Sequence, residues 1–123
     1  MKHILIIDDA TTVRMYHRQV LSEAGFAVDE SINGVEALEK ALTKHYDLFV
    51  VDVNMPKMDG YRFLRELRSN ADLHQAPAVM VSTEAEDKDR DAAWAAGANY
   101  YMTKPTKPEA LTRVAHLLTG DAQ

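Results

Sequence analysis

The sequence predicts an α/β fold, a doubly wound three-layer sandwich in which helices cover both faces of a five-stranded parallel sheet. Short apolar runs alternate with amphipathic stretches along the chain, in five β-then-α units. The runs are rich in β-branched residues, which is typical of strands buried on both faces. Strands that alternate with helices form a parallel sheet through right-handed crossovers. Because no linker, repeat or low-complexity segment interrupts the pattern, we expect one domain over residues 1–123.

The first two units are indicated by an apolar run, a helical period and two turn signals. Residues 4–7, Ile-Leu-Ile-Ile, are expected as a buried strand, and the helix over 12–24 ends before Gly25, a favourable C-cap. Residues 26–31 are a weaker strand. Asn33 and the glycine after it form the turn into the second helix. The apolar positions with helical spacing are Val13, Tyr16, Val20 and Leu21 in the first helix and Val35, Leu38 and Leu42 in the second.

The remaining three units follow the same alternation, and proline and glycine mark their boundaries. Strands are expected at 47–53, 78–82 and 99–103, and helices at 61–68, 87–96 and 109–118. The run DLFVVDV is the clearest buried strand, and the turn-rich loop 54–60 follows it. Pro77 precedes the fourth strand, and Gly97 ends the alanine-rich fourth helix. Pro105 and Pro108 precede the last helix.

Composition and charge exclude several classes of protein. The chain has no cysteine, which excludes a disulfide framework, thiolate metal sites and a cysteine nucleophile. Its net charge of −5 argues against a nucleic-acid partner, and no apolar run approaches the ~18 residues of a membrane span. The N-terminus becomes acidic after a short apolar run, unlike a signal peptide, so we expect a soluble cytoplasmic protein with no membrane partner. The histidines lack metal-ligand spacing, and we expect all of them at the surface: His3, His17, His45, His74 and His116.

Polar residues gather where the predicted strands end. In doubly wound sheets, ligands bind outside the carboxyl ends of the strands. Those positions are Asp8 and Asp9 after the first strand, Asp52 at the end of the third, Ser82 and Thr83 at the end of the fourth, and Lys104 after the fifth. We therefore expect carboxylate, hydroxyl and ammonium groups to converge on a single edge of the fold.

The chemistry of this set indicates a divalent cation and a phosphoryl group. Adjacent carboxylates raise one another's pKa unless a cation lies among them, and oxygen ligands suit Mg²⁺ or Mn²⁺ rather than zinc. An ion held by Asp9 and Asp52 keeps positions open for a phosphoryl oxygen. Lys104 and Ser82 can contact further oxygens of the same group. Asp52, at the end of a rigid strand, is the expected nucleophile.

Parts of this set also have a purely structural interpretation. Asp8 and Asp9 can equally cap the helix that follows them, and Lys104 with its neighbouring proline is by itself an ordinary loop dipeptide. Asp52 is harder to explain as structure, because a lone carboxylate at the end of a buried run is costly. The coincidence of these polar groups at four strand ends favours the functional interpretation.

A resemblance to a known family rests on four segments: ILIIDD, VVDVNMPKMDG, PAVMVSTEAE and AGANYYMTKP. They resemble the receiver domain of two-component response regulators, most closely the single-domain, CheY-like chemotaxis type. The resemblance covers essentially the whole chain and implies the flavodoxin-like strand order 2-1-3-4-5, which is a property of the family and not a result of the spacing. The length of 123 residues, with only the tail 119–123 after the last predicted helix, leads us to expect a receiver without an output domain, whose output would be a surface of the receiver itself.

The resemblance assigns a role to each residue at the expected site. Asp52 would accept a phosphoryl group from a phosphohistidine on a histidine kinase. Asp9 and Asp52 would bind Mg²⁺ directly, with the backbone carbonyl of Asn54 as a third ligand. Asp8 would act on the ion partly through water. Lys104 would contact the phosphoryl group, and its bond to the next proline is cis in the family pattern.

The resemblance also implies switch residues and positions that set the lifetime of the phosphoryl group. Ser82 is the hydroxyl that moves onto the phosphoryl group, and the ring of Tyr101 turns inward with it. Trp94 either joins Tyr101 on an apolar output surface of the fourth helix, fifth strand and fifth helix, or covers small neighbouring side chains. A glutamate near the attack path can orient water, so we expect a short-lived phosphoryl state. The positions that tune this lifetime are Asn54, Thr83 and Glu84.

Partners and rival functions follow from the same residues. We expect a histidine kinase as phosphodonor, a flagellar motor switch protein or a phosphatase as a further partner, and a monomer that dimerises on phosphorylation. The alternative is a phosphate-sink or relay receiver outside chemotaxis. An aspartyl-phosphate hydrolase needs a general acid where Asn54 stands, and a flavodoxin-type FMN carrier would place its phosphate against Asp8 and Asp9, which repel it. We therefore expect no enzyme activity beyond the protein's own phosphorylation and autodephosphorylation.

Overall fold

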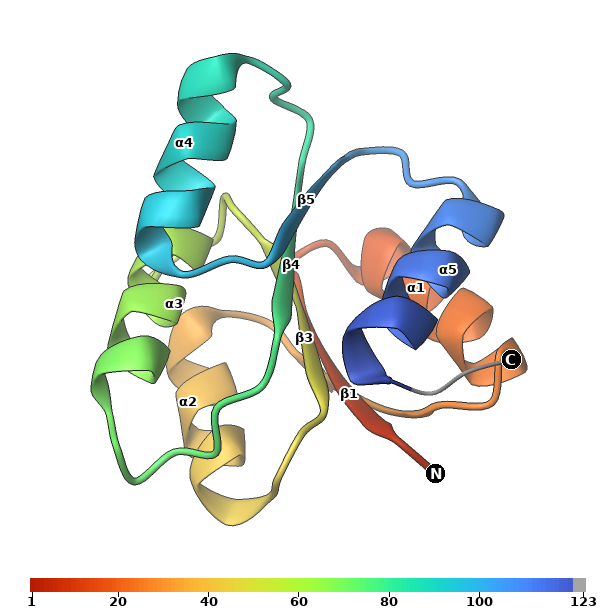
Figure 1. Ribbon diagram of the computed structural model, residues 1–123, viewed down its shortest axis with the longest axis horizontal. Coiled ribbons are helices and arrows are strands. Elements are labelled where there is room, and N and C mark those ends of the chain that lie inside the picture. The colour runs from red at the N-terminus through yellow and green to blue at the C-terminus, as the bar shows by residue number, and fades with distance from the viewer. Residues whose placement is uncertain (121–123) are drawn as a thin grey trace.

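Five strands and five helices alternate in the computed structural model, which describes residues 1–120 (Figure 1). The strands are β1 (His3–Ile7), β2 (Ala27–Ser31), β3 (Leu48–Asp52), β4 (Ala78–Ser82) and β5 (Tyr100–Thr103). The helices are α1 (Thr11–Glu23), α2 (Gly34–Thr43), α3 (Gly60–Ser69), α4 (Asp87–Ala96) and α5 (Pro108–Thr119). The predicted boundaries differ from these by about one residue at most. Residues 121–123, at the end of the tail expected after the last helix, lie outside the described residues.

The strands form one parallel sheet in the order β2-β1-β3-β4-β5, which confirms the predicted fold class and strand order. Helices α1 and α5 cover one face of the sheet, and α2, α3 and α4 cover the other (Figure 1). Every residue of β3 is buried. Its alternate side chains enter two apolar clusters, Phe49 and Val51 on one face and Leu48 and Val50 on the other. Burial on both faces explains the continuous apolar run in this part of the sequence.

Helix α2 packs against the sheet mainly through small residues, although larger apolar residues mark it in the sequence. Ala37 and Ala41 are buried, whereas Val35 is 41% exposed and Leu42 is 64% exposed. Of the three predicted positions, Leu38 packs partly against the core. The alanines occupy the inward face, four residues apart, and the bulkier Val35 and Leu42 lie on another face of the helix. The apolar spacing therefore predicts the helix correctly, while its most deeply buried face is formed by the alanines.

Two of the histidines are buried, so the expectation that all lie at the surface is wrong. His17 is 1% exposed and His116 is 8% exposed, while the other three are at least partly exposed. His17 lies on the inward face of α1 one turn before the buried Leu21, and the ring of His116 lies 4.9 Å from that of Phe26. The spacing of His17 and Leu21 is the signal for this burial. Residue type alone predicts the opposite, because histidine carries two polar nitrogens.

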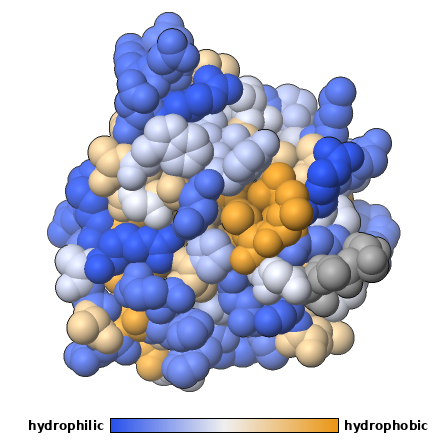
Figure 2. Space-filling view, viewed as in Figure 1, coloured by the Kyte–Doolittle hydropathy of each residue, from blue (hydrophilic) through white to orange (hydrophobic). Residues whose placement is uncertain are grey.

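The outer surface around α4, β5 and α5 carries exposed apolar side chains. Trp94 and Tyr100 are each 46% exposed, and Leu117 is 73% exposed. Helix α4 packs inward through Ala93 and Ala96, which leaves Trp94 half exposed. Figure 2 shows a compact apolar area over α5 in an otherwise mostly hydrophilic face. Within residues 1–120, no helix has both the length and the apolar character needed to cross a bilayer.

Candidate functional site

Lys104 links two of the carboxylates at the strand ends. It follows β5, and its Nζ lies 2.9 Å from Asp8 Oδ2 and 2.8 Å from Asp52 Oδ1. Its backbone N–H donates to the carbonyl of Ser82 at 2.8 Å, which continues the pairing of β4 with β5 beyond the sheet. Its peptide bond to Pro105 is cis. The carboxyl edge therefore brings together residues from the ends of β1, β3 and β5, as the strand-end rule leads one to expect.

Three carboxylates form a compact acidic group at this edge. Asp8, Asp9 and Asp52 each present one oxygen, and these oxygens lie within 4.8 Å of one another. Asp8 and Asp52 are buried, whereas Asp9 is exposed, so the group opens to solvent on one side. Oxygen ligands at such spacing fit a hard divalent cation such as Mg²⁺. The exposed positions that the sequence points to around this edge are Asp9, Asn54, Thr83 and Glu84.

Neither Asp8 nor Asp9 caps helix α1. The N-cap is Ala10, which provides no side-chain cap. One oxygen of Asp8, Oδ1, instead accepts a hydrogen bond from the Ala10 N–H at 2.9 Å, and the other meets Lys104. Asp8 therefore shapes the turn into α1 and contributes to the acidic group at the same time.

The electrostatics of the site favour a bound cation. Burial raises the pKa of Asp52 to about 6; the hydrogen bond from Lys104 opposes this rise, and the negative charge of Asp8 adds to it. Burial alone lowers the pKa of Lys104, but its bonds to Asp52 and Asp8 outweigh burial and leave the pKa raised. Three carboxylates thus face one ammonium group. A divalent cation would neutralise the excess negative charge.

Backbone contacts hold the two buried acids in place. Gly60, the first residue of α3, packs so closely on β3 that a Cβ there would lie 2.3 Å from the carbonyl oxygen of Asp52. Arg14 of α1 donates from Nη1 to the carbonyl of Asp8 at 2.8 Å, and its Nε pairs with Glu30 Oε1 of β2 at 3.0 Å. The sequence alone does not predict the close packing of Gly60 on Asp52 or the hydrogen bond of Arg14 to Asp8. The position of Arg14, one turn into the helix that follows the acid pair, is the available signal.

The two switch candidates lie beside the β4–α4 loop. Ser82 is 1% exposed, and its Oγ accepts a hydrogen bond from the Glu84 N–H at 3.1 Å. Tyr101 is 7% exposed, its hydroxyl donates to the Glu84 carbonyl at 2.7 Å, and the guanidinium of Arg90 lies 5.4 Å from the centre of its ring. The ring of Tyr101 packs into the cluster between the sheet and α2–α4, because it is turned inward. Tyr101 is therefore not exposed beside Trp94, contrary to the expectation of a shared apolar surface.

A family model for the response regulator receiver domain matches residues 4–116. The chain belongs to this family. The receiver is 35% identical over 121 residues to the transcriptional regulatory protein ResD of Bacillus subtilis (strain 168), across 98% of this chain and 49% of ResD. It is 38% identical over 122 residues to the sensor protein EvgS of Escherichia coli (strain K12), across 93% of this chain and 10% of EvgS. The chain thus spans about half of the first relative and a tenth of the second.

Solved structures of similar proteins agree with the family and the fold. The chemotaxis protein CheY4 of Vibrio cholerae superposes with a TM-score of 0.90 at 31% identity, over 96% of this chain and 98% of that chain. A putative response regulator from Chloroflexus aurantiacus J-10-fl has a TM-score of 0.92 at 29% identity, over 97% and 98%. The receiver domain of the sensor histidine kinase PA1611 from Pseudomonas aeruginosa PAO1 has a TM-score of 0.89 at 28% identity, over 98% of both chains, and holds a magnesium ion in its active-site cleft. The receiver domain described here is therefore CheY-like in fold.

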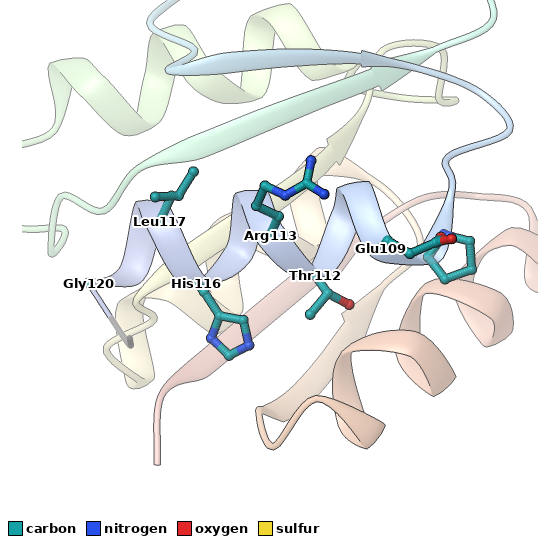
Figure 3. Close-up of a pocket in the computed structure, with 7 residues that line it drawn as sticks. Glu109, Thr112, Arg113, His116, Leu117 and Gly120 are labelled. Atoms are coloured by element: carbon teal, nitrogen blue, oxygen red, sulfur yellow. The ribbon is translucent and has the colours of Figure 1, made fainter. Parts of the chain in front are cut away.

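A separate hollow lies along α5. It has a volume of about 800 Å³ and is lined by Pro108, Glu109, Thr112, Arg113, His116, Leu117 and Gly120 (Figure 3). All of these residues belong to α5 or its C-terminal cap, and none is among the strand-end residues of the acidic group. This hollow is part of the outer surface of the receiver and not of the candidate site.

Proposed function

We propose that this receiver domain of two-component signalling is a phosphorylation-dependent switch whose phosphoacceptor is Asp52. The observation that carries the proposal is the contact of one lysine with two buried carboxylates, Lys104 Nζ with Asp8 and Asp52, beside the exposed Asp9. Among these acids, Asp52 stands at the end of the central strand β3, every residue of which is buried.

The arrangement suits phosphoryl transfer from a phosphohistidine. An oxygen of Asp52 forms a bond to phosphorus while the P–N bond to the donor imidazole breaks, and the electron pair of that bond returns to the ring. Lys104 is placed to neutralise one phosphoryl oxygen, since its Nζ already lies 2.8 Å from Asp52. Mg²⁺, or Mn²⁺, would be held by Asp8, Asp9, Asp52 and the carbonyl of Asn54, and it supplies charge neutralisation when bound.

The switch couples this chemistry to the β4–α4 loop. A phosphoryl group adds charge and acceptor oxygens, and a Ser82 hydroxyl that turns toward it leaves the N–H of Glu84, which it contacts at 3.1 Å. The same residue accepts the hydrogen bond from Tyr101. A change at Ser82 therefore reaches Tyr101 through Glu84. We define the output face as the exposed side chains of Trp94, Tyr100 and Leu117. Strand β5, which contains Tyr101, connects the change to this face.

We propose a histidine kinase as phosphodonor and a flagellar motor switch protein as target, with a phosphatase as a further partner in the cytoplasm. The likeness to the chemotaxis protein CheY4 supports a role in chemotaxis. A second candidate is a phosphate sink or relay, which the likeness to the sensor protein EvgS and to the receiver domain of PA1611 favours. Phosphorylated protein immobilised as bait distinguishes these two functions. Capture of a motor switch protein supports the role in chemotaxis. Transfer of the phosphoryl group to a histidine phosphotransfer protein supports the phosphate sink or relay.

The decisive experiment for the activity is incubation with a small phosphodonor such as acetyl phosphate, read by intact mass. Wild-type protein with Mg²⁺ should gain one phosphoryl group, and chelation by EDTA should prevent this gain. Asp52→Asn should gain none, whereas the matched control Asp72→Asn, at an exposed loop position, should behave as wild type. An adduct of equal yield on Asp52→Asn would refute the assignment.

The coupling to the output face has its own test. A Ser82→Ala, Tyr101→Ala double variant should still accept the phosphoryl group but lose the phosphorylation-dependent change in partner binding. Unchanged partner binding would refute the proposed route through the β4–α4 loop.

A further inference from the structure

Two consecutive side chains of α1 hold Thr106, the second residue after Lys104. The hydroxyl of Tyr16 donates to the carbonyl of Thr106 at 2.7 Å. Nε2 of His17 lies 3.1 Å from Thr106 Oγ1, across 89 residues of sequence. Thr106 is 4% exposed. Both the backbone and the side chain of this residue are therefore bonded to the same turn of α1.

The burial of His17 is costly, and packing alone does not explain it. Burial lowers the pKa of His17, with Asp8 raising it and Lys104 lowering it further, so the ring is neutral at neutral pH. Its Nδ1 is buried and has no hydrogen-bond partner within the described residues. A buried polar atom without a partner costs about 1–3 kcal/mol, a penalty that an apolar side chain of similar size avoids. The bond that His17 does make, to Thr106, is therefore the feature that distinguishes it from an apolar residue.

The loop that carries Lys104 is tied by hydrogen bonds to β4 and to α1. A hollow of about 370 Å³ lies beside this loop, and it is lined by Val13 and other α1 residues, by Thr83, and by Lys104, Pro105 and Thr106. At the start of the loop, the Lys104 N–H donates a hydrogen bond to the carbonyl of Ser82. Two residues later, Thr106 is hydrogen-bonded to Tyr16 and His17 of α1. The backbone around Lys104 is thus held by hydrogen bonds on both sides, to β4 at Lys104 and to α1 at Thr106.

We infer that Tyr16, His17 and Thr106 form a clamp that positions Lys104 for phosphoryl transfer. A lysine side chain has many rotamers, so the placement of its Nζ between two carboxylates depends on a fixed backbone. The clamp residues act through Lys104, and this inference rests on the proposed role of Asp52 as phosphoacceptor.

The first test removes one hydrogen-bonding group at nearly constant shape. Thr106→Val should lower the rate constant of phosphorylation by acetyl phosphate about tenfold, with the dissociation constant for Mg²⁺ unchanged. Thr106→Ser keeps the hydroxyl and should keep the wild-type rate. The matched control is Thr112→Val on α5, which should have no effect. A parallel fall in Mg²⁺ affinity, or an unchanged rate in Thr106→Val, would overturn the inference.

Two further variants separate positioning from folding. In a Lys104→Ala background, Thr106→Val should cause no additional loss of rate, because the clamp acts through the ammonium group. A His17→Leu, Thr106→Val double variant replaces both polar partners with apolar ones, which should restore the urea midpoint while the rate stays low. An additive loss in the first case, or a rate that recovers together with stability in the second, would show a merely structural role.

The clamp also has a test that does not depend on phosphorylation. If the wild-type protein forms no adduct, the proposed function fails, and the clamp is judged from the NMR signal of the Lys104 ammonium group. Thr106→Val should broaden or shift this signal, and Thr112→Val should not. Identical signals in all three proteins would overturn the inference.

Discussion

Asp52 is 5% exposed and shares its lysine with a second buried carboxylate, Asp8, so its negative charge is poorly stabilised without a metal ion. We expect Asp52→Asn to raise the free energy of unfolding of the metal-free protein at neutral pH. A pKa of about 6, against 3.8 for an unperturbed aspartate, corresponds to about 3 kcal/mol at ~1.4 kcal/mol per pKa unit. Asparagine keeps an acceptor for Lys104 but loses the charge-assisted part of that bond, so we expect a net gain of about 1–3 kcal/mol.

The pH dependence of this difference has a definite sign. Because the folded protein holds a proton on Asp52 more tightly than the unfolded chain does, the contribution of Asp52 to wild-type stability falls as pH rises from the unfolded pKa of 3.8 to the folded pKa of about 6. The penalty is complete above the folded value and absent below the unfolded one. The stability advantage of Asp52→Asn should therefore be largest at neutral pH and shrink as the pH falls toward 4.

Urea unfolding followed by circular dichroism, in EDTA and then in Mg²⁺, measures this difference. Mg²⁺ should stabilise the wild-type protein and have a smaller effect on Asp52→Asn, because the variant lacks one carboxylate ligand. Asp72→Asn, at an exposed aspartate, is the control and should match the wild type throughout. A variant that is less stable than the wild type in EDTA at neutral pH, or an advantage that does not change with pH, would refute the reasoning.

Three further predictions concern the core, the backbone and the surface. Burial lowers the pKa of His17, so the contribution of this residue to wild-type stability should decrease as pH falls through the unfolded value of 6.5. His17→Gln should show less of this decrease when urea midpoints are measured against pH. Equal slopes of midpoint against pH in the two proteins would contradict the prediction. Gly60→Ala should cost about 2–3 kcal/mol and slow phosphorylation, because the added Cβ would lie 2.3 Å from the Asp52 carbonyl oxygen. Gly25→Ala, which meets no atom but has a φ of +98°, should cost only about 1 kcal/mol in the same assay. Trp94→Ala, at a half-exposed site, should change the free energy of unfolding by less than about 0.5 kcal/mol. It should leave phosphorylation intact and weaken partner binding. Equal loss of phosphorylation and partner binding would indicate a structural role.

Much of the fold follows from local pattern, because buried parallel strands are continuous apolar runs. The segment that contains Phe49 and Val51 is apolar throughout, since its side chains enter both clusters. Helical faces are less well encoded. In α2 the spacing of Val35 and Leu42 fits a helix equally well whether that face is buried or exposed, and the burial of Ala37 depends on how closely the helix approaches the sheet.

The sequence alone places carboxylates at the ends of strands, because each strand end is recognised from the residues next to it, where an apolar run gives way to polar residues. Which of these groups touch depends on the strand order and on the helices packed over the loops. Lys104 meets Asp52 across 52 residues and Asp8 across 96 residues, and His17 meets Thr106 across 89. No local pattern specifies such pairs, because the free energy that forms them comes from burial of the whole sheet between its two layers of helices. The sequence thus determines which polar groups the edge can offer, and tertiary packing determines that one lysine is shared by two buried acids and is held in place from α1.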